Sequence, residues 1–427
     1  MKKIFLLILS SSITFALFAG NINDTIYNVV NKGITFNLTK DKKYFVKLGV
    51  HGQIWSRFMQ LNPGTVDYNG TSVKTDADIL LRRTCMSYYV HLDNFTFFSM
   101  IALTAQPHTS SLNGSAPFHP QLFFYDAWGS YDFANGKFIA GGGLNMYNGI
   151  SRASSASSMR SLGADVPLIA APNLTSTEQA ARQLSIFATG NINSFAYRIA
   201  VAKPFVCNTI PDNIIPNTIY NLPNHNYSFK GYFEYQIFDK ESNKMPFKPA
   251  TYIGEKKILN IGAGFDFQPD ATVMYSETDI ETKYNKLHFA VDAFVDYPFA
   301  NKSAVTFYAS QFWFNYGPNY TQSFGIVDIY KNGTSEYQFG TGNSTFLQIA
   351  YLLPAKQKSN RLQPYYEFTL RNFDGANKKL YHHNVGINYF VIGHKLKFSL
   401  QYENRPYVNG NSIERKSLII GKMQFSI

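Results

Sequence analysis

The stretch NVGINYFVIGHKLKFSLQYENRPYVNGNSIERKSLIIGKMQFSI, residues 384–427, alternates between apolar and polar side chains almost to its last residue. In its middle, Leu396, Phe398, Leu400 and Tyr402 alternate with Lys397, Ser399, Gln401 and Glu403. After a short polar loop the pattern returns between positions 419 and 427. Period two is typical of a β-strand with one apolar face. The stretch therefore predicts two such strands.

The other end of the chain has the features of an export signal. Lys2 and Lys3 precede an apolar segment, residues 4–18, and small residues follow at Ala19 and Gly20. We expect a secretory signal peptide over residues 1–19, cut after Ala19, because the segment is short for a spanning helix. An uncleaved N-terminal anchor is the alternative. No later stretch is apolar for long enough to span a membrane as a helix, so an exported chain is either soluble or a barrel.

The rest of the chain, residues 20–427, reads as one domain of alternating segments. Aromatic residues make up 16% of the sequence, with 29 Tyr and 37 Phe, as the aromatic girdles of a membrane barrel require. The candidate strands are 43–59, 78–91, 95–105, 122–133, 136–143, 183–191, 194–204, 229–239, 256–268, 285–296, 303–316, 345–355, 361–373, 383–391, 394–404 and 415–427. Short turns alternate with longer connections between them. This predicts an all-β fold, a closed antiparallel transmembrane β-barrel of about sixteen strands. The connection near 240–255 is too long for this rhythm, so it could hide a further strand.

Alternation also assigns faces to the strands. It places Lys47, Arg57, Arg198 and Arg371 on the polar face, toward the lumen, together with Glu234, Asp292 and Glu367. A charge on the lipid face near the membrane midplane costs about 2–4 kcal/mol. These cations and carboxylates are therefore expected to line a channel.

One long connection, residues 146–182, stands apart. It is rich in Ser and Ala and carries Arg152, Arg160 and Arg182 with few acids. Long loops without strand character are usually functional or disordered. Because it is the third long loop and its residues are small, we expect it to fold inward and to place Arg152 and Arg160 at the narrowest point of the pore. An external surface loop is the alternative.

The formal charge of the chain is +11. Removing residues 1–19 loses two Lys and no acid, so the mature chain carries 39 − 2 − 28 = +9. Short basic runs and export argue against a nucleic-acid partner. Cations along a lumen would favour anions by focusing the electric field. The alternative is that they contact lipid headgroups and surface polysaccharide.

Other chemistry finds little support. The two cysteines, Cys85 and Cys207, form neither a disulfide framework nor a zinc site, although one optional bridge stays open. The sequence holds no GxSxG or HExxH motif. We therefore expect no enzyme activity, no cofactor and no metal.

Four segments resemble the phosphate-selective porin O and P family. They are GITFNLTKDKKYFVKLGVHGQIWSRF (33–58), ILLRRTCMSYYVHLDNFTFFSMIALT (79–104), IAGGGLNMYNGISRASSASSMRSLGADVPL (139–168) and NVGINYFVIGHKLKFSLQYENR (384–405). The resemblance implies a sixteen-stranded barrel, commonly trimeric, which in some members passes phosphate. It implies that Arg82 or Arg83 belongs to a basic pair on the second strand, and that Arg152 and Arg160 begin the constriction loop. The chain departs from the family in lacking a dense arginine ladder and in ending on Ile427.

We therefore expect a bacterial outer-membrane channel for passive diffusion of small hydrophilic solutes, with a mild preference for anions that could include phosphate. Its expected partners are outer-membrane lipid, lipopolysaccharide and two further copies of the chain. The alternative is a barrel that is not a general pore, either an adhesin or a lipid-modifying enzyme. A secreted soluble β-protein is a third reading.

Overall fold

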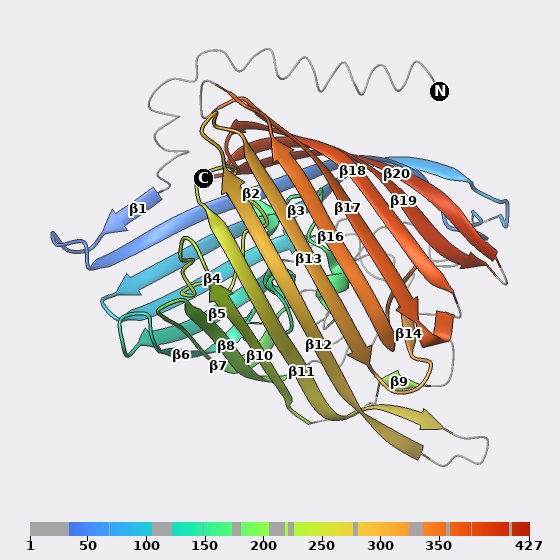
Figure 1. The fold of residues 1–427 in the computed structure, drawn as a ribbon, viewed down its shortest axis with the longest axis horizontal. Coiled ribbons are helices and arrows are strands. Elements are labelled where there is room, and N and C mark those ends of the chain that lie inside the picture. The colour runs from blue at the N-terminus through green and yellow to red at the C-terminus, as the bar shows by residue number, and fades with distance from the viewer. Residues whose placement is uncertain are drawn as a thin grey trace.

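Sixteen antiparallel strands close into a barrel (Figure 1). The computed structural model describes residues 34–67, 69–104, 122–147, 149–172, 181–204, 218–220, 226–275, 281–323, 336–355, 359–376, 378–409 and 412–427. The barrel strands, in order around the ring, are β2 (Tyr44–Gln60), β3 (Thr75–Leu92), β4 (Phe95–Thr104), β5 (Phe123–Asp132), β6 (Ile139–Asn145), β7 (Gln183–Ile192), β8 (Phe195–Lys203), β10 (Ser228–Gln236), β11 (Ile258–Tyr275), β12 (Glu281–Pro298), β13 (Ala304–Asn315), β16 (Gly342–Leu352), β17 (Arg361–Phe373), β18 (Lys379–Ile392), β19 (Leu396–Asn409) and β20 (Ser412–Ser426). Each of the sixteen predicted ranges overlaps one of these strands, so the predicted fold class is confirmed.

The ring closes where β2 pairs with β20. His51 lies opposite Ser426, and Met59 lies opposite Leu418. Ile427 still exchanges backbone hydrogen bonds with Val50, at N···O distances of 2.9 and 3.3 Å. Beyond that point β1 (Ile34–Asn37) takes over as the partner of β2. The short strand therefore covers the edge of β2 that β20 does not reach.

Three further strands lie outside the ring. The two-residue β9 (Ile219–Tyr220) pairs with β11, and β14 (Thr321–Ser323) pairs with β15 (Tyr337–Gly340) in a separate small sheet. Among the described residues, no helix is both long enough and apolar enough to cross a membrane.

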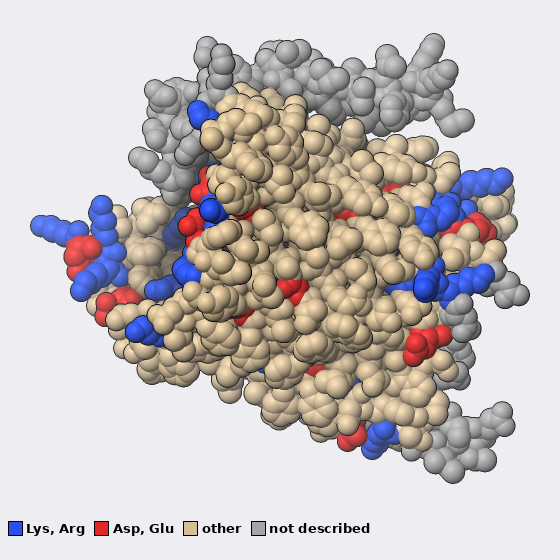
Figure 2. Space-filling model, viewed as in Figure 1, with Lys and Arg blue, Asp and Glu red and all other residues tan. Residues whose placement is uncertain are grey.

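The wall has an apolar outer face and a polar inner face. Along β12, residues 286–296 alternate strictly: Leu287 and Phe289 are exposed, whereas Lys286, His288 and Asp292 are buried. Figure 2 shows the outside of the wall, where charged side chains gather at the two ends and the band between them is mostly uncharged. Six residues assigned to the inner face are all buried, in agreement with that assignment: Arg57, Arg198, Glu234, Asp292, Glu367 and Arg371. That they line a channel stays a prediction.

The connections differ between the two ends of the barrel. At one end, which we call the short-turn end, the strands are joined by brief turns such as 93–94, 193–194 and 393–395. The opposite end, the long-loop end, carries the connections 61–74 and 146–182. The exception at the short-turn end is the stretch 237–257, which contains no strand. The hypothesis of a hidden strand there is therefore wrong.

Two sequence predictions fall partly or wholly on undescribed residues. The signal peptide over 1–19 lies outside the described residues, and so does Cys207. Cys85 lies in β3, is buried and has no disulfide partner among the described residues. Whether the two cysteines pair is therefore not tested.

Candidate functional site

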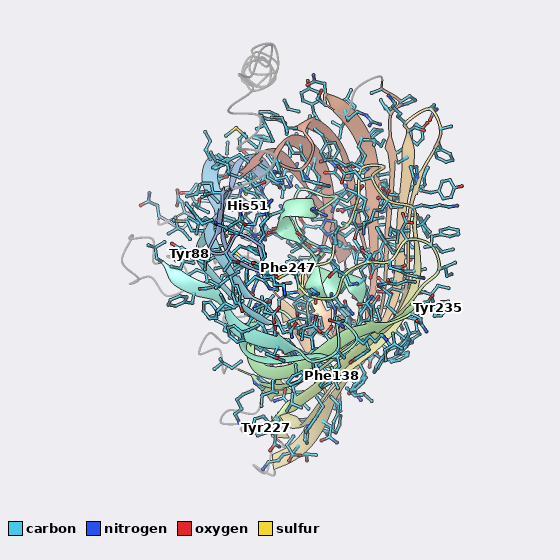
Figure 3. The ribbon with its side chains drawn as sticks, turned by 90° about the vertical axis from the view of Figure 1, so that its left-hand side faces the viewer. His51, Tyr88, Phe138, Tyr227, Tyr235 and Phe247 are labelled. Carbon is cyan, nitrogen blue, oxygen red and sulfur yellow. The ribbon has the colours of Figure 1, made fainter. Side chains whose placement is uncertain are left out.

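The connection 146–182, which we call the third loop, contacts strands far around the ring from its own neighbours β6 and β7. Residues 158–164 supply most of these contacts, with β2, β19 and β20. The hydrogen bonds are Gln53 Nε2 to the Ser158 carbonyl (3.0 Å), Gln424 Nε2 to the Met159 carbonyl (2.7 Å), Lys397 Nζ to the Ser161 carbonyl (2.8 Å) and Lys422 Nζ to the Ala164 carbonyl (2.9 Å). Figure 3, which views the ring from the short-turn end, shows the short helical turns of this loop within the circle of strands. These turns are η2 (Arg152–Ser155), η3 (Ser158–Arg160) and η4 (Leu168–Ala170).

Two consecutive arginines of β3 hold the third loop through one carboxylate. Arg82 Nη2 donates to Asp165 Oδ2 and Arg83 Nη2 donates to Asp165 Oδ1, both at 2.7 Å. Successive strand residues normally point to opposite faces. Here Gln53 lies opposite Arg83 and the next residue, Ile54, lies opposite Leu81, so Arg82 is the extra residue of a β-bulge. The bulge is what lets both guanidiniums face inward.

Arg152 is buried in a network of charges rather than exposed. Its guanidinium donates two hydrogen bonds to Glu241, at 2.6 and 2.8 Å, and a third to the Pro249 carbonyl, at 2.7 Å. Its carbon Cζ lies 3.8 Å from the centre of the Phe294 ring. Its backbone N–H donates to Asp292 Oδ2 at 2.7 Å. Arg152 therefore joins the third loop to two other parts of the barrel interior.

Four other predicted cations, three on the wall and Arg182 at the end of the third loop, are also hydrogen-bonded inside the barrel. Each is buried and donates to a carboxylate, an amide oxygen or a carbonyl. The contacts are Arg57 to Asp78 (2.5 Å), Arg182 to Asp126 (3.1 Å), Arg198 to Asn243 Oδ1 (2.9 Å) and to the Pro246 carbonyl (2.7 Å), and Arg371 to Glu336 and to Gln338 Oε1 (3.0 Å). A charge paired this closely with a carboxylate contributes little field at a distance, so Arg57, Arg182 and Arg371 mainly stabilise the interior. Arg198 is buried against neutral oxygens and is not exposed to a passage.

Lys47 and Arg160 differ from the rest because both are exposed. Lys47 lies in the part of β2 nearest the short-turn end, and Arg160 ends the turn η3 of the third loop. Neither side chain has a carboxylate partner within the described part of the chain. Both charges act on Lys395, in the adjacent turn: burial and the repulsion by Lys47 and Arg160 lower the pKa of Lys395. Lys395 is therefore within electrostatic reach of both exposed cations.

The stretch 237–257, which we call the inner turn, was missed by sequence reasoning. Its residues Glu241, Asn243, Lys248 and Thr251 are all buried. Figure 3 shows Phe247 of this turn near the middle of the ring. The sequence signal that could have indicated its role is its length, because the other turns at this end of the barrel are short. Its buried contacts become visible only in the folded chain.

Electrostatics favour the charged forms of the acids that hold the two segments. Burial alone would raise the pKa of Asp165, but the Arg82 and Arg83 guanidiniums hold it below its usual range. Burial likewise opposes ionisation of Glu241, and Arg152 and Lys248 overcome it to lower the Glu241 pKa. Both carboxylates are therefore ionised at neutral pH. Among the described residues, no cluster of His, Cys, Asp and Glu has the arrangement of a metal site.

The fold is similar to that of solved outer-membrane channels. The chain matches the anion-selective porin from Comamonas acidovorans (9% identity, TM-score 0.52, covering 90% of this chain and 99% of that one). It also matches Salmonella typhi OmpF, solved with daunomycin (10% identity, TM-score 0.54, 91% and 99%), and Pseudomonas putida OprB at high pH (10% identity, TM-score 0.52, 94% and 96%). No protein-family model and no curated protein matches the sequence. At these identities the likeness concerns the fold, and the chain therefore has the barrel fold of outer-membrane porins.

Proposed function

We propose that this protein is an outer-membrane channel for the passive diffusion of small hydrophilic solutes. The observation that carries the proposal is the sorting of side chains on a closed ring, apolar outside and polar or charged inside. An apolar outer face matches lipid, and a polar inner face is what a wet passage requires. Similarity to porin folds supports the same function, and the proposal needs no catalytic residue.

The pathway in this proposal is narrowed by the third loop and has a mild preference for anions. Because five of the eight predicted cations are paired with carboxylates and Arg198 is buried, we assign the preference mainly to Lys47 and Arg160. Exposed cations at a narrow opening raise the local concentration of anions and repel cations. Arg152 then has a structural part in the constriction.

Phosphate is the narrower candidate among the anions, and it rests on the resemblance to the phosphate-selective porin O and P family. That family's arginine contacts would have to compete here with Asp165, which already occupies Arg82 and Arg83. A general anion preference is therefore the form we propose. If phosphate blocked chloride current at micromolar concentration, phosphate selectivity would be the correct proposal.

The same proposal predicts the processing of the chain, its lipid contacts and its assembly. Residues 1–19 would be removed on export, the outer face would contact lipid and lipopolysaccharide, and three copies would assemble. The apolar band seen on the outer wall fits both lipid and a neighbouring barrel (Figure 2). Gel migration of unheated, detergent-solubilised protein would report the assembly state.

Single-channel recording tests the function directly. The purified, folded protein, added to a planar lipid bilayer in KCl, should insert and give stepwise increases in current. The same preparation after heat denaturation is the control and should give none. Folded protein that inserts without conducting would contradict the proposal.

A further inference from the structure

The inner turn extends across the interior of the barrel. It leaves the wall at β10 and returns at β11, and on the way it contacts β12, β17 and β4. Thr251 Oγ1 donates to Asp296 of β12 (3.1 Å), Gln363 Nε2 of β17 donates to Thr251 Oγ1 (3.3 Å), and Phe247 packs edge-on against Phe98 of β4, with ring centres 5.9 Å apart. A mere connection between neighbouring strands needs two to five residues. The additional residues of the inner turn make contacts inside the ring.

The inner turn also pairs with the third loop along the backbone. Lys248 N–H donates to the Ser155 carbonyl and Ser157 N–H donates to the Lys248 carbonyl, both at 2.8 Å. Ala250 N–H donates to the Arg160 carbonyl at 3.0 Å. Ala156 and Lys248 thereby form a parallel β-bridge. Two segments that enter from opposite ends of the barrel are thus joined edge to edge.

Four buried charges reinforce this pairing. Glu241 of the inner turn binds Arg152 of the third loop through both carboxylate oxygens, and Tyr252 donates its hydroxyl to the same carboxylate. Lys248 Nζ donates to Glu234 of β10 at 3.1 Å. Two cations and two anions therefore balance, and the side chains of all four are almost fully buried. Removing one partner of such a set leaves a buried charge without compensation.

We propose that the inner turn is the anchor of the third loop, and that Glu241, acting through Arg152, fixes the width of the channel. This inference rests on the proposed channel function. The third loop is otherwise tied to the wall at residues 158–165 and, in its first half, by the backbone of Arg152 to Asp292 and of Ala153 to the Tyr308 hydroxyl. Release from the inner turn would leave its first half with these few wall contacts and would let it move further. A loop free to move at the narrow part of a passage changes the current that passes.

The test compares Glu241→Gln with Glu255→Gln in planar bilayers. Glu255 lies in the same turn but is exposed, so its substitution is the matched control. We expect Glu241→Gln to broaden the distribution of open-channel conductances and to raise its mean, whereas Glu255→Gln should match the parent. Hydrogen exchange in detergent should speed up by roughly tenfold or more at 155–160 and 248–250 in Glu241→Gln, since a hydrogen bond to a charged group is lost.

A second variant separates anchoring from general destabilisation. Arg152→Lys keeps the charge but loses the two-pronged contact, and it should give the same conductance change. The double variant should go no further than either single one, because both changes break one interaction; independent damage would add. Arg152→Lys alone also tests the proposal if Glu241→Gln does not fold.

The outcomes distinguish the two proposals. A parent protein that does not conduct would overturn the channel function itself. A conducting parent whose conductance is unchanged by Glu241→Gln and Arg152→Lys would overturn the anchor alone, whether or not exchange is faster.

Discussion

At Arg160 and Lys47 the charged groups are exposed, whereas at Arg152 the guanidinium is enclosed by Glu241, the Pro249 carbonyl and the Phe294 ring. Both kinds of arginine come from the same loop and look alike in the sequence. What separates them is the partner that folding supplies. Only a cation without a close counter-charge acts on ions that pass several ångströms away.

The residue-scale prediction concerns these exposed cations. Replacing Lys47 and Arg160 together with Gln should move the reversal potential under a KCl gradient toward cation preference. A unit charge at about 4 Å in water is worth about 1 kcal/mol, a factor of about five for one ion, and it acts with opposite sign on anions and cations. Removing two such charges should therefore lower the anion-to-cation permeability ratio by about fivefold or more. Lys137→Gln, at an exposed lysine of another short turn, is the control and should leave the ratio unchanged. An unchanged ratio in the double variant would remove these two residues from the pathway.

Pairing across the barrel is the part of the site that the sequence could not predict. Alternation fixed the faces of Arg198 and Arg371 because period two depends only on neighbours in the chain. The partners Glu241 for Arg152 and Asn243 for Arg198 lie 89 and 45 residues away. Both partners belong to the inner turn, which in the sequence is only a connection that is too long for the spacing of the strands. No local pattern carries that information.

At the scale of elements, β3 and β6 show how a regular strand pattern is modified. The bulge in β3 adds one residue and so turns both Arg82 and Arg83 inward. Strand β6 instead uses glycines. A Cβ atom built on Gly141 would lie 2.3 Å from the Gly129 carbonyl oxygen and 2.6 Å from Cζ of Phe187. The close approach of β5, β6 and β7 therefore depends on the missing side chain.

This gives a prediction about the wall beside the third loop. Gly141→Ala should destabilise the folded barrel by about 1–3 kcal/mol, the usual cost of forcing atoms into a packed site. Gly421→Ala in β20 is the matched control, since the nearest atoms to its added Cβ are 3.8 Å away. Urea unfolding followed by gel migration would measure both. Equal stability of the two variants would show that β6 can move aside.

Over the whole molecule, strand number and closure could be predicted, whereas the contents of the barrel could not. Each strand carries its own alternating signal, and an even set of such strands has few ways to bury its polar edges other than closing. The interior depends instead on how two segments from opposite ends meet, as at Ala156 and Lys248. The net charge of +11 likewise says nothing about which cations are neutralised inside.

That distribution of charge makes a final prediction about salt. Screening shortens the reach of exposed charges from about 10 Å in 0.1 M salt to about 3 Å in 1 M salt, whereas buried pairs are screened much less. If anion preference comes from exposed Lys47 and Arg160, the permeability ratio measured under a fixed tenfold KCl gradient should approach unity as the mean salt concentration rises over that range. A ratio that stays constant would assign selectivity to the enclosed cations around Arg152 instead. The same recordings on Lys47→Gln/Arg160→Gln should show little salt dependence, because the charges that salt would screen are already gone.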